Sequence, residues 1–322
     1  VVLPEGADPA KYSVETSVWN PNKQKLTAVR TSLAQMKYNN NQAEQEFVIQ
    51  APSLWSPEMP ALYSAETRLY EGDKLKDIYT TPFGIRSIEI IPDKGFFLNG
   101  KRTVFKGVCN HHDLGPLGAA VNDAAIRRQI RILKDMGCNA IRTSHNMPAP
   151  ELIRACDEMG MMIMAESFDE WNNGYNLLFD EWAEKDLVNL LHNFRNNPSV
   201  VMWCIGNEVP NQWNEGDCKI AKWLQDICHR EDPTRPVTQG MDAPDAVVNN
   251  NFAAVMDVAG FNYRPFKYKI NYKKLPQRIV LGSETASTVS SRGVYKFPVE
   301  RKAMAKYDDH QASSYDVEHC GW

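Results

Sequence analysis

The sequence has no long apolar run and no block of basic residues, and both absences limit what the chain can do. No apolar stretch among its 322 residues reaches the roughly 18 residues that a membrane-spanning helix requires. The formal net charge is −4, from 36 Lys and Arg against 40 Asp and Glu. The sequence therefore predicts neither nucleic acid nor a membrane as a partner.

Two kinds of site are also missing. The seven cysteines are odd in number and show no C-x-x-C spacing, so they predict buried free thiols rather than a disulfide framework or a zinc site. No glycine-rich phosphate loop follows the first apolar run of the second half, which weakens a dinucleotide-binding fold. The remaining composition, 43% hydrophobic and 24% charged, is that of an ordinary globular protein.

Residues 1–88 show short alternating runs separated by clusters of Asn, Pro and Gly. The candidate strands are 12–18, 25–33, 46–49 and 62–69. Alternation with frequent breakers, and without any helix-length periodic segment, predicts an all-β sandwich over this part of the chain.

From residue 89 to 322 the pattern changes to short apolar runs that alternate with amphipathic helices. The predicted strands are 103–109, 140–143, 162–165, 200–205, 237–239, 255–262 and 279–282. The helical stripes include Ile126, Ile130, Leu133 and Met136, with Asn122 or Asp123 as the cap and Gly137 at the end; Leu152, Ala155, Cys156 and Met159; Ala183, Leu187, Leu190, Leu191 and Phe194; and Ile220, Trp223, Leu224, Ile227 and Cys228.

Seven successive β-α units predict a parallel sheet, either doubly wound or closed as a (β/α)8 barrel. No eighth strand is identifiable after Glu284. The barrel is therefore expected to be incomplete at the C-terminal end of this chain.

Polar and aromatic side chains follow the predicted strands, where a parallel barrel carries its chemistry. Such a set suits a sugar, which offers apolar ring faces and many hydroxyl groups. Glu208 and Glu284 end the fourth and seventh strands, so they can face each other across a bound sugar. A retaining glycosidase needs two carboxyl groups about 5–5.5 Å apart. Taken alone, however, a Glu after a strand is more often a surface or helix-capping group, and Arg142 can equally hold a carboxylate or contact substrate.

Several motifs, in order along the chain, resemble glycoside hydrolase family 2. They are Phe83-Gly84-Ile85-Arg86, Phe97-Leu98-Asn99-Gly100-Lys101, Lys106-Gly107-Val108, the stretch 137–146 with Asn139-Ala140-Ile141-Arg142, Trp203-Cys204-Ile205-Gly206-Asn207-Glu208, and Ser283-Glu284. The resemblance implies an immunoglobulin-like domain followed by a TIM-type (β/α)8 barrel. It also implies a retaining exo-β-glycosidase acting on terminal non-reducing β-linked sugars.

The resemblance further implies roles for individual residues. Glu208 would be the general acid and then the base, and Glu284 would be the nucleophile of a covalent glycosyl-enzyme. The implied substrate-binding residues are His111, Arg142, His145, Asn146, Asp169, Trp171, Asn207 and Tyr263, with Asn207 on the sugar 2-hydroxyl, Tyr263 on Glu284, and Arg142 beneath the nucleophile.

The implied substrate is a small-molecule or oligosaccharide β-glycoside. β-D-galactosides come first, because His111 and His145 match histidines of that branch; β-glucuronides and β-mannosides are the alternatives. The alternative function from a non-enzyme class is that of an inactive carbohydrate-binding fragment. Asn172 stands where the family's magnesium site has a histidine, so we expect no metal and no cofactor. The resemblance suggests a periplasmic or secreted protein, with a cytoplasmic location as the alternative. The sequence gives no oligomeric state.

Overall fold

The computed structural model describes all residues except 2, 36–43, 173–177, 215–217 and 287–322. The chain divides into two compact units, which are described separately. One comprises Val1–Arg86 with Asn196–Pro198, and the other comprises Ser87–Arg195 with Ser199–Trp322.

The first unit is rich in sheet, as an immunoglobulin-like domain is. After the short helix η1 (Pro9–Lys11) come strands β1 (Tyr12–Trp19), β2 (Lys25–Ser32), β3 (Tyr63–Glu71) and β4 (Lys74–Phe83). They form one antiparallel sheet in the order β2-β1-β3-β4, with Tyr12, Val14 and Leu33 in its core. Two details differ from expectation: residues 46–49 form no strand, and β4, almost wholly exposed, has no alternation that could reveal it.

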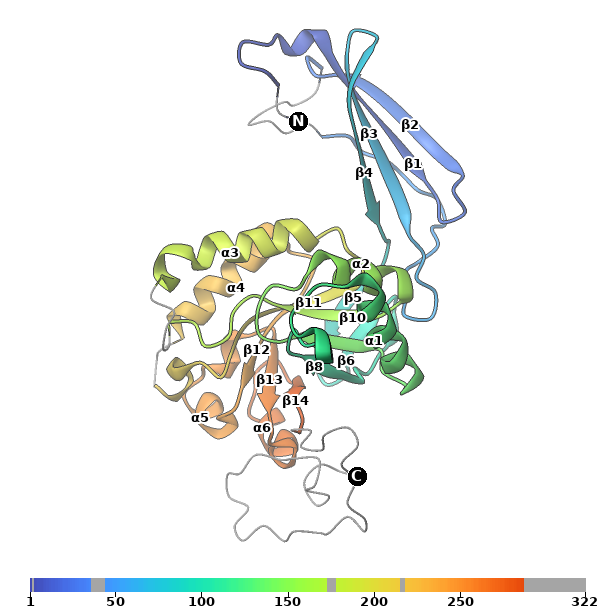
Figure 1. The fold of residues 1–322 in the computed structure, drawn as a ribbon. Coiled ribbons are helices and arrows are strands. Elements are labelled where there is room, and N and C mark those ends of the chain that lie inside the picture. The colour runs from blue at the N-terminus through green and yellow to red at the C-terminus, as the bar shows by residue number, and fades with distance from the viewer. Residues whose placement is uncertain (2, 36–43, 173–177, 215–217, 287–322) are drawn as a thin grey trace. The chain divides into compact units, whose positions relative to one another are not determined.

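The second unit is built on a seven-stranded parallel sheet that curls into a nearly closed barrel (Figure 1). Its strands are β8 (Gly107–Asn110), β9 (Ala140–Thr143), β10 (Met162–Glu166), β11 (Val200–Asn207), β12 (Val237–Met241), β13 (Val258–Asn262) and β14 (Val280–Glu284). Neighbours in sequence are neighbours in the sheet, from β8 to β14. All seven predicted strands are therefore present, although the first begins at Gly107 rather than at 103. The chain beyond Ala286, where no eighth strand was identifiable, lies outside the described residues.

A small antiparallel sheet precedes the barrel and was not predicted. It consists of β5 (Ile88–Ile91), β6 (Gly95–Leu98) and β7 (Lys101–Arg102). Ile90 packs with Phe105 against Met202, Val258 and Ile279, which lie toward the amino ends of the barrel strands. This apolar cluster fills the end of the barrel opposite to the strand ends that carry polar residues.

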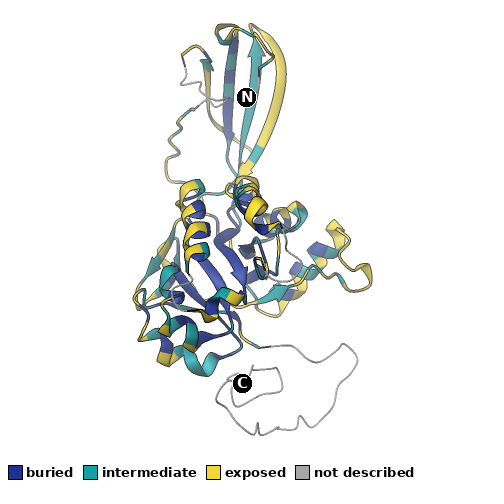
Figure 2. Cartoon of the chain, turned by 90° about the vertical axis from the view of Figure 1, so that its left-hand side faces the viewer, coloured by how far each residue is buried: buried dark blue, intermediate teal, exposed yellow. Residues whose placement is uncertain are grey.

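Helices surround the sheet and turn their apolar faces toward it. They are α1 (Asp123–Asp135), α2 (Pro150–Met159), α3 (Phe179–Phe194), α4 (Lys219–Glu231), α5 (Pro244–Asn249) and α6 (Tyr268–Tyr272), with short η2 (Gly115–Leu117), η3 (Pro210–Trp213), η4 (Ala253–Val255) and η5 (Pro265–Lys267). Figure 2 shows buried strands at the centre and exposed outer faces on the helices. No helix of the described residues is both long and apolar enough to cross a membrane.

The helix boundaries follow the predicted signals, with two errors in the stripes. Asn122 caps α1, where its Oδ1 accepts from Ala125 N at 3.0 Å, and Gly137 follows the helix with a φ of +89°. Met136, however, is 70% exposed, because the chain has left the helix there, and Trp223 on α4 is 36% exposed.

Candidate active site

The carboxyl ends of the barrel strands hold the polar side chains in place. All eight residues of β11 are buried, and the strand ends at Asn207, directly before Glu208. Glu208 N donates to Gly240 O at 2.8 Å, and Tyr263 N donates to Glu284 O at 2.6 Å. Glu208 and Tyr263 both have a left-handed backbone, with φ of +45° and +55°. Non-glycine residues adopt this conformation at a cost, and such residues concentrate at functional sites.

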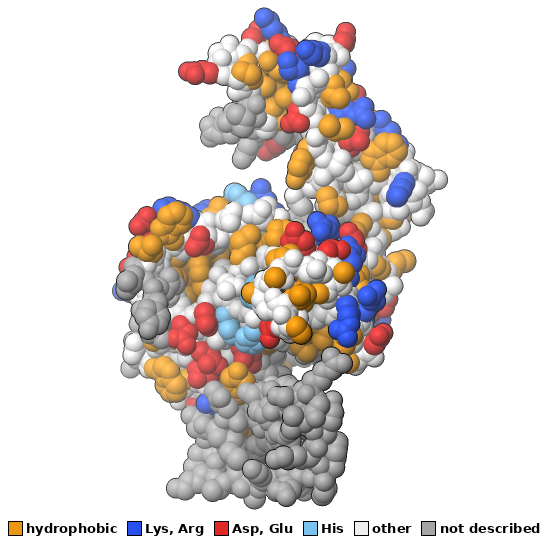
Figure 3. Space-filling view, viewed as in Figure 1, with side chains coloured by type: hydrophobic (Ala, Val, Ile, Leu, Met, Phe, Trp, Pro, Cys, Tyr) orange, Lys and Arg blue, Asp and Glu red, His pale blue; other side chains and the backbone are white. Residues whose placement is uncertain are grey.

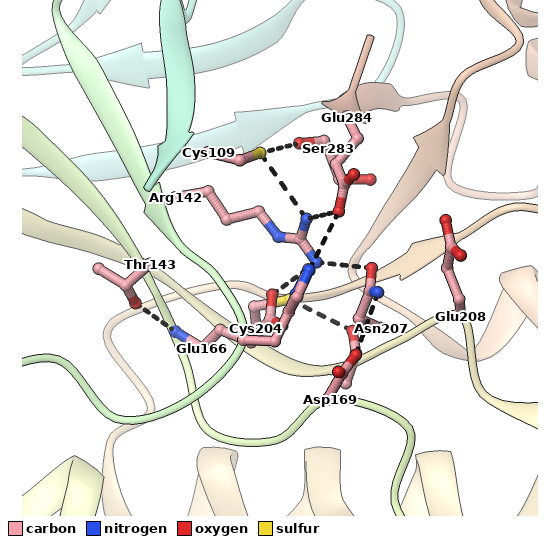
Figure 4. Close-up of polar contacts among 12 residues, drawn as sticks. Cys109, Arg142, Thr143, Glu166, Asp169, Cys204, Asn207, Glu208, Ser283 and Glu284 are labelled. Carbon is pink, nitrogen blue, oxygen red and sulfur yellow. Dashed lines mark hydrogen bonds and ion pairs between the residues drawn. The ribbon is translucent and has the colours of Figure 1, made fainter. Parts of the chain in front are cut away.

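Arg142, on β9, lies between two carboxylates (Figure 4). Its Nη1 is 2.6 Å from Glu284 Oε1 and its Nη2 is 2.6 Å from Glu166 Oε2. The three side chains are 3%, 7% and 0% exposed. The thiol of Cys109 donates to Ser283 O at 3.1 Å on the same side of the site. A buried cation of this kind stabilises the ionised form of a neighbouring carboxylate.

The surroundings of Glu284 favour its carboxylate form. Burial alone would raise its pKa, but the Arg142 charge, the hydroxyl of Tyr263 and the hydrogen bond from Arg142 together lower it. The Tyr263 hydroxyl donates to Oε2, while Arg142 donates to Oε1. Glu284 is therefore an anion with both oxygens held in place.

The surroundings of Glu208 have the opposite effect. Burial raises its pKa above the usual glutamate range, and the charges of Asp242 and Glu284 raise it further. A hydrogen bond from Asn262 Nδ2 to Glu208 Oε1, at 2.9 Å, and the Arg264 charge oppose this shift without cancelling it. Glu208 therefore keeps a proton to a higher pH than an ordinary glutamate.

A continuous chain of hydrogen bonds joins these two carboxyl groups. Arg142 Nη2 donates to Asn207 Oδ1 at 3.0 Å, and Asn262 Nδ2 donates to the same oxygen at 3.0 Å. Because Arg142 reaches Glu284 and Asn262 reaches Glu208, the chain runs from one glutamate to the other. Figure 4 shows Arg142 joined to Glu284 and to Asn207, with the Glu208 side chain to one side of Asn207.

Gly240, on β12, leaves the space that this arrangement occupies. A Cβ at this position would lie 2.7 Å from Arg142 Nη2, 2.7 Å from Asn207 Oδ1 and 3.2 Å from Asn262 Oδ1. These distances are shorter than van der Waals contact, and all three atoms belong to buried residues. Any side chain at 240 would therefore displace part of the hydrogen-bonded chain.

The two predicted histidines lie together. His145 Nδ1 is 2.7 Å from Glu166 Oε1 and its Nε2 is 3.6 Å from Glu284 Oε1. Burial would lower the pKa of His145, but the hydrogen bond and charge of Glu166 raise it above the usual value. The His111 ring meets the His145 ring edge-on, with centroids 4.9 Å apart. Figure 3 shows histidine beside acidic side chains on one face of this unit.

A cavity of about 820 Å³ lies on the Glu284 side of the site. Its polar lining includes Cys109, His111, Arg142, Tyr263 and Glu284. From there it extends toward the apolar residues at the other end of the barrel, and Glu208 does not line it. The cavity therefore reaches the nucleophile candidate but not the acid candidate.

The remaining predicted substrate contacts are Asp169, Asn146 and Trp171. Asp169 is exposed, and its Oδ1 accepts from Asn207 Nδ2 at 3.2 Å. Asn146 is exposed. Trp171 is 1% exposed, and its Nε1 donates to Ile205 O at 2.6 Å, so its ring belongs to the core behind β11 and does not reach solvent.

The sequence predicted no catalytic or substrate-binding role for Glu166, Asn262, Cys109 or Ser283. Glu166 and Asn262 are the last residues of β10 and β13, a position that marks them in the same way as Asn207. Both are 0% exposed. The strand pattern therefore could have marked Glu166 and Asn262 as site residues. It could not have shown the contacts of Cys109 and Ser283. Within the described ranges, no group of three or more His, Cys, Asp or Glu gathers as a metal site would.

Comparison with known proteins agrees with this architecture. Residues 89–316 match the family model "Glycosyl hydrolases family 2, TIM barrel domain", and residues 2–86 match the model "Glycosyl hydrolases family 2". A solved structure of a glycosyl hydrolase family 2 member from Bacteroides cellulosilyticus is 37% identical, with a TM-score of 0.76 over 86% of this chain and 36% of that one.

Two curated relatives carry different activities in their names. The β-galactosidase BoGH2A of Bacteroides ovatus is 37% identical over 322 residues, which cover 86% of this chain and 38% of that protein. A β-glucuronidase of Bacteroides fragilis is 33% identical over 199 residues, or 59% of this chain and 28% of that protein. The chain thus spans well under half the length of these relatives. With both of its units matched by the family's models, the chain belongs to glycosyl hydrolase family 2.

Proposed function

We propose that the full-length protein is a retaining exo-β-glycosidase that hydrolyses terminal non-reducing β-linked sugars. The first candidate substrates are β-D-galactosides. The observation that carries the proposal is that the pKa values of two glutamates in one site are shifted in opposite directions. The pKa of Glu284 is lowered and that of Glu208 is raised. Two carboxyl groups whose surroundings separate their pKa values can act as nucleophile and acid at the same pH.

In the first step, Glu284 attacks the anomeric carbon while Glu208 donates its proton to the glycosidic oxygen, so the aglycone leaves as an alcohol. A covalent glycosyl-enzyme remains on Glu284. In the second step, Glu208 takes a proton from water, which attacks the anomeric carbon and releases the sugar with retained configuration. Arg142 and Tyr263 hold Glu284 ionised and oriented for the first step, and they stabilise the carboxylate that leaves the sugar in the second step.

The sugar is proposed from the site and from the relatives' names. His111 and His145 present imidazole groups beside Glu284, which suit hydroxyl groups. A glucuronide adds a carboxylate, which requires a cationic partner. Arg142 is already bound to Glu166 and Glu284, so we do not expect it to bind that carboxylate. β-Glucuronides are the second candidate, because one relative is named a β-glucuronidase, and β-mannosides are the third.

The test combines a substrate panel with a mechanism-based label. Nitrophenyl β-galactoside, β-glucuronide and β-mannoside are assayed on the full-length protein, and the matching 2-deoxy-2-fluoro glycoside is followed by mass spectrometry of peptides. We expect one sugar to be cleaved, an adduct on Glu284, and neither turnover nor adduct in Glu284→Gln. Glu181→Gln is the matched control, because Glu181 is 62% exposed on α3. Turnover retained by Glu284→Gln, or intact sugar bound without an adduct, would overturn the proposal, and the latter favours a binding protein.

A further inference from the structure

Asn262 makes three hydrogen bonds at the centre of the site. It is the last residue of β13 and is 0% exposed. Its Nδ2 donates to Glu208 Oε1 at 2.9 Å and to Asn207 Oδ1 at 3.0 Å, and its Oδ1 accepts from Ser283 Oγ at 2.7 Å. Both amide hydrogens are thus used, which leaves this side chain no donor for a substrate.

The orientation of this amide follows from Arg142. A guanidinium can only donate hydrogen bonds, so the Asn207 atom that Arg142 Nη2 approaches at 3.0 Å must be the oxygen. The Asn262 atom that meets the same oxygen must then be the NH₂ group. It follows that Asn262 presents a donor, not an acceptor, to Glu208 Oε1.

Hydrogen bonds at both ends hold Asn262 in this orientation. Its Nδ2 donates to Glu208 and Asn207, and its Oδ1 accepts from Ser283 Oγ. Ser283 is itself 5% exposed, so this last hydrogen bond is also buried. A flip of the amide would break all three hydrogen bonds.

A protonated carboxyl group carries its proton on one oxygen and accepts hydrogen bonds on the other. We propose that Asn262 is a positioning residue for Glu208: it holds Oε1 as the accepting oxygen and thereby leaves Oε2 as the oxygen that carries the transferable proton. This inference rests on the proposed function. In glycosylation the Oε2 proton passes to the glycosidic oxygen as its bond to the anomeric carbon breaks, and in deglycosylation the attacking water returns a proton to Oε2.

The same hydrogen bond strengthens when Glu208 becomes a carboxylate, because charge-assisted hydrogen bonds are stronger than neutral ones. It therefore assists proton donation and lowers the pKa of Glu208 against the effect of burial. The charged groups that act on Glu208 are Asp242, Glu284 and Arg264. Removing the Asn262 amide leaves those three groups in place, so the pKa of Glu208 rises.

The test is the dependence of kcat/KM on leaving group and on pH in Asn262→Ala and Asn262→Asp, measured with the sugar that the wild type prefers. A 2,4-dinitrophenyl leaving group departs without a proton, whereas a phenyl leaving group needs one. General acid catalysis contributes about 10²–10⁴-fold, so we expect a loss of about 100-fold with phenyl glycosides and under about 5-fold with dinitrophenyl glycosides. The alkaline limb of the pH profile moves to higher pH.

Asn271→Ala is the matched control, because Asn271 is also 0% exposed and its amide bonds to Asp245, on α5. In Asn271→Ala we expect any loss of kcat/KM to be equal for all leaving groups, and the alkaline limb of the pH profile to stay where it is in the wild type. The same uniform loss in both Asn262 variants would overturn the inference while the fluorosugar adduct on Glu284 still supports the proposed function. Absence of that adduct in the wild type would overturn both.

Discussion

Arg142 and Glu284 form a buried ion pair, with Nη1 2.6 Å from Oε1 and side chains 3% and 7% exposed. Arg142 carries a second carboxylate, Glu166, at the same distance. Glu284 thus shares its guanidinium partner with a second carboxyl group, so protons taken up or lost in the site are expected to change its activity. Its pH dependence is the most direct consequence of this geometry.

We expect kcat/KM to follow a bell-shaped pH profile. Glu284 must be ionised, and its lowered pKa keeps it so below the ordinary glutamate range; activity is lost as the pH falls through that value. Glu208 must be protonated, and its raised pKa extends activity upward; activity is lost as the pH rises through that value. Two limbs that both coincide with an ordinary glutamate pKa would contradict the assignment.

Replacing Tyr263 by Phe removes the hydroxyl that donates to Glu284 Oε2 and keeps the ring. We expect the acid limb to move to higher pH, because a hydrogen bond to the carboxylate is lost. We also expect kcat to fall by about 10²-fold, as for loss of one catalytic hydrogen-bond donor. The matched control is Tyr272→Phe, which breaks a hydroxyl contact to Asp93 at the other end of the barrel. A similar loss in both variants would count against a direct role of Tyr263.

Replacing Glu208 by Ala removes the acid and base but leaves the nucleophile. With a dinitrophenyl glycoside the first step needs no acid, so the glycosyl-enzyme accumulates and turnover becomes slow. Azide, which needs no base, then attacks the intermediate and restores turnover, giving a β-glycosyl azide. Product analysis by NMR gives the anomeric configuration. Azide that leaves the rate of Glu208→Ala unchanged argues for a different role for Glu208.

Helix α1 provides a test of the packing. Ile130 is 0% exposed and Ile132 is 41% exposed on the same helix. We expect Ile130→Ala to lower the free energy of unfolding by about 2–5 kcal/mol, because it leaves a cavity in the barrel's outer core. Ile132→Ala should change it by less than about 0.5 kcal/mol. Denaturant midpoints of the two variants, measured side by side, decide whether the helix is oriented as described.

The sequence predicted the barrel well because its central strands are buried on both faces and its helices on one. β11 is a continuous apolar run, and the stripe from Ala183 to Phe194 is wholly buried, so both patterns are clear. β4 lacks such a signal, since most of its side chains face solvent. The small sheet of β5 to β7 is too short for a period to emerge.

For the site, the sequence could supply the residues at strand ends but not their connections. Arg142 was assigned to the nucleophile or the substrate, and the structure adds Glu166 as a second partner. Trp171 follows a strand like a site residue, yet its indole lies in the core, where Nε1 donates to Ile205 O. The direction in which a side chain points after a strand depends on contacts across the fold, which composition does not reveal.

Besides its backbone, Gly240 contributes the space that a side chain would fill, and this has a consequence for how the protein tolerates change. In a mutational scan of the whole chain, position 240 is expected to behave like an essential reactive group, although it has no side chain. Adding a single methyl there would shift an arginine and an amide oxygen from their places. Surveys that search only for acids, bases and nucleophiles will overlook this class of indispensable position.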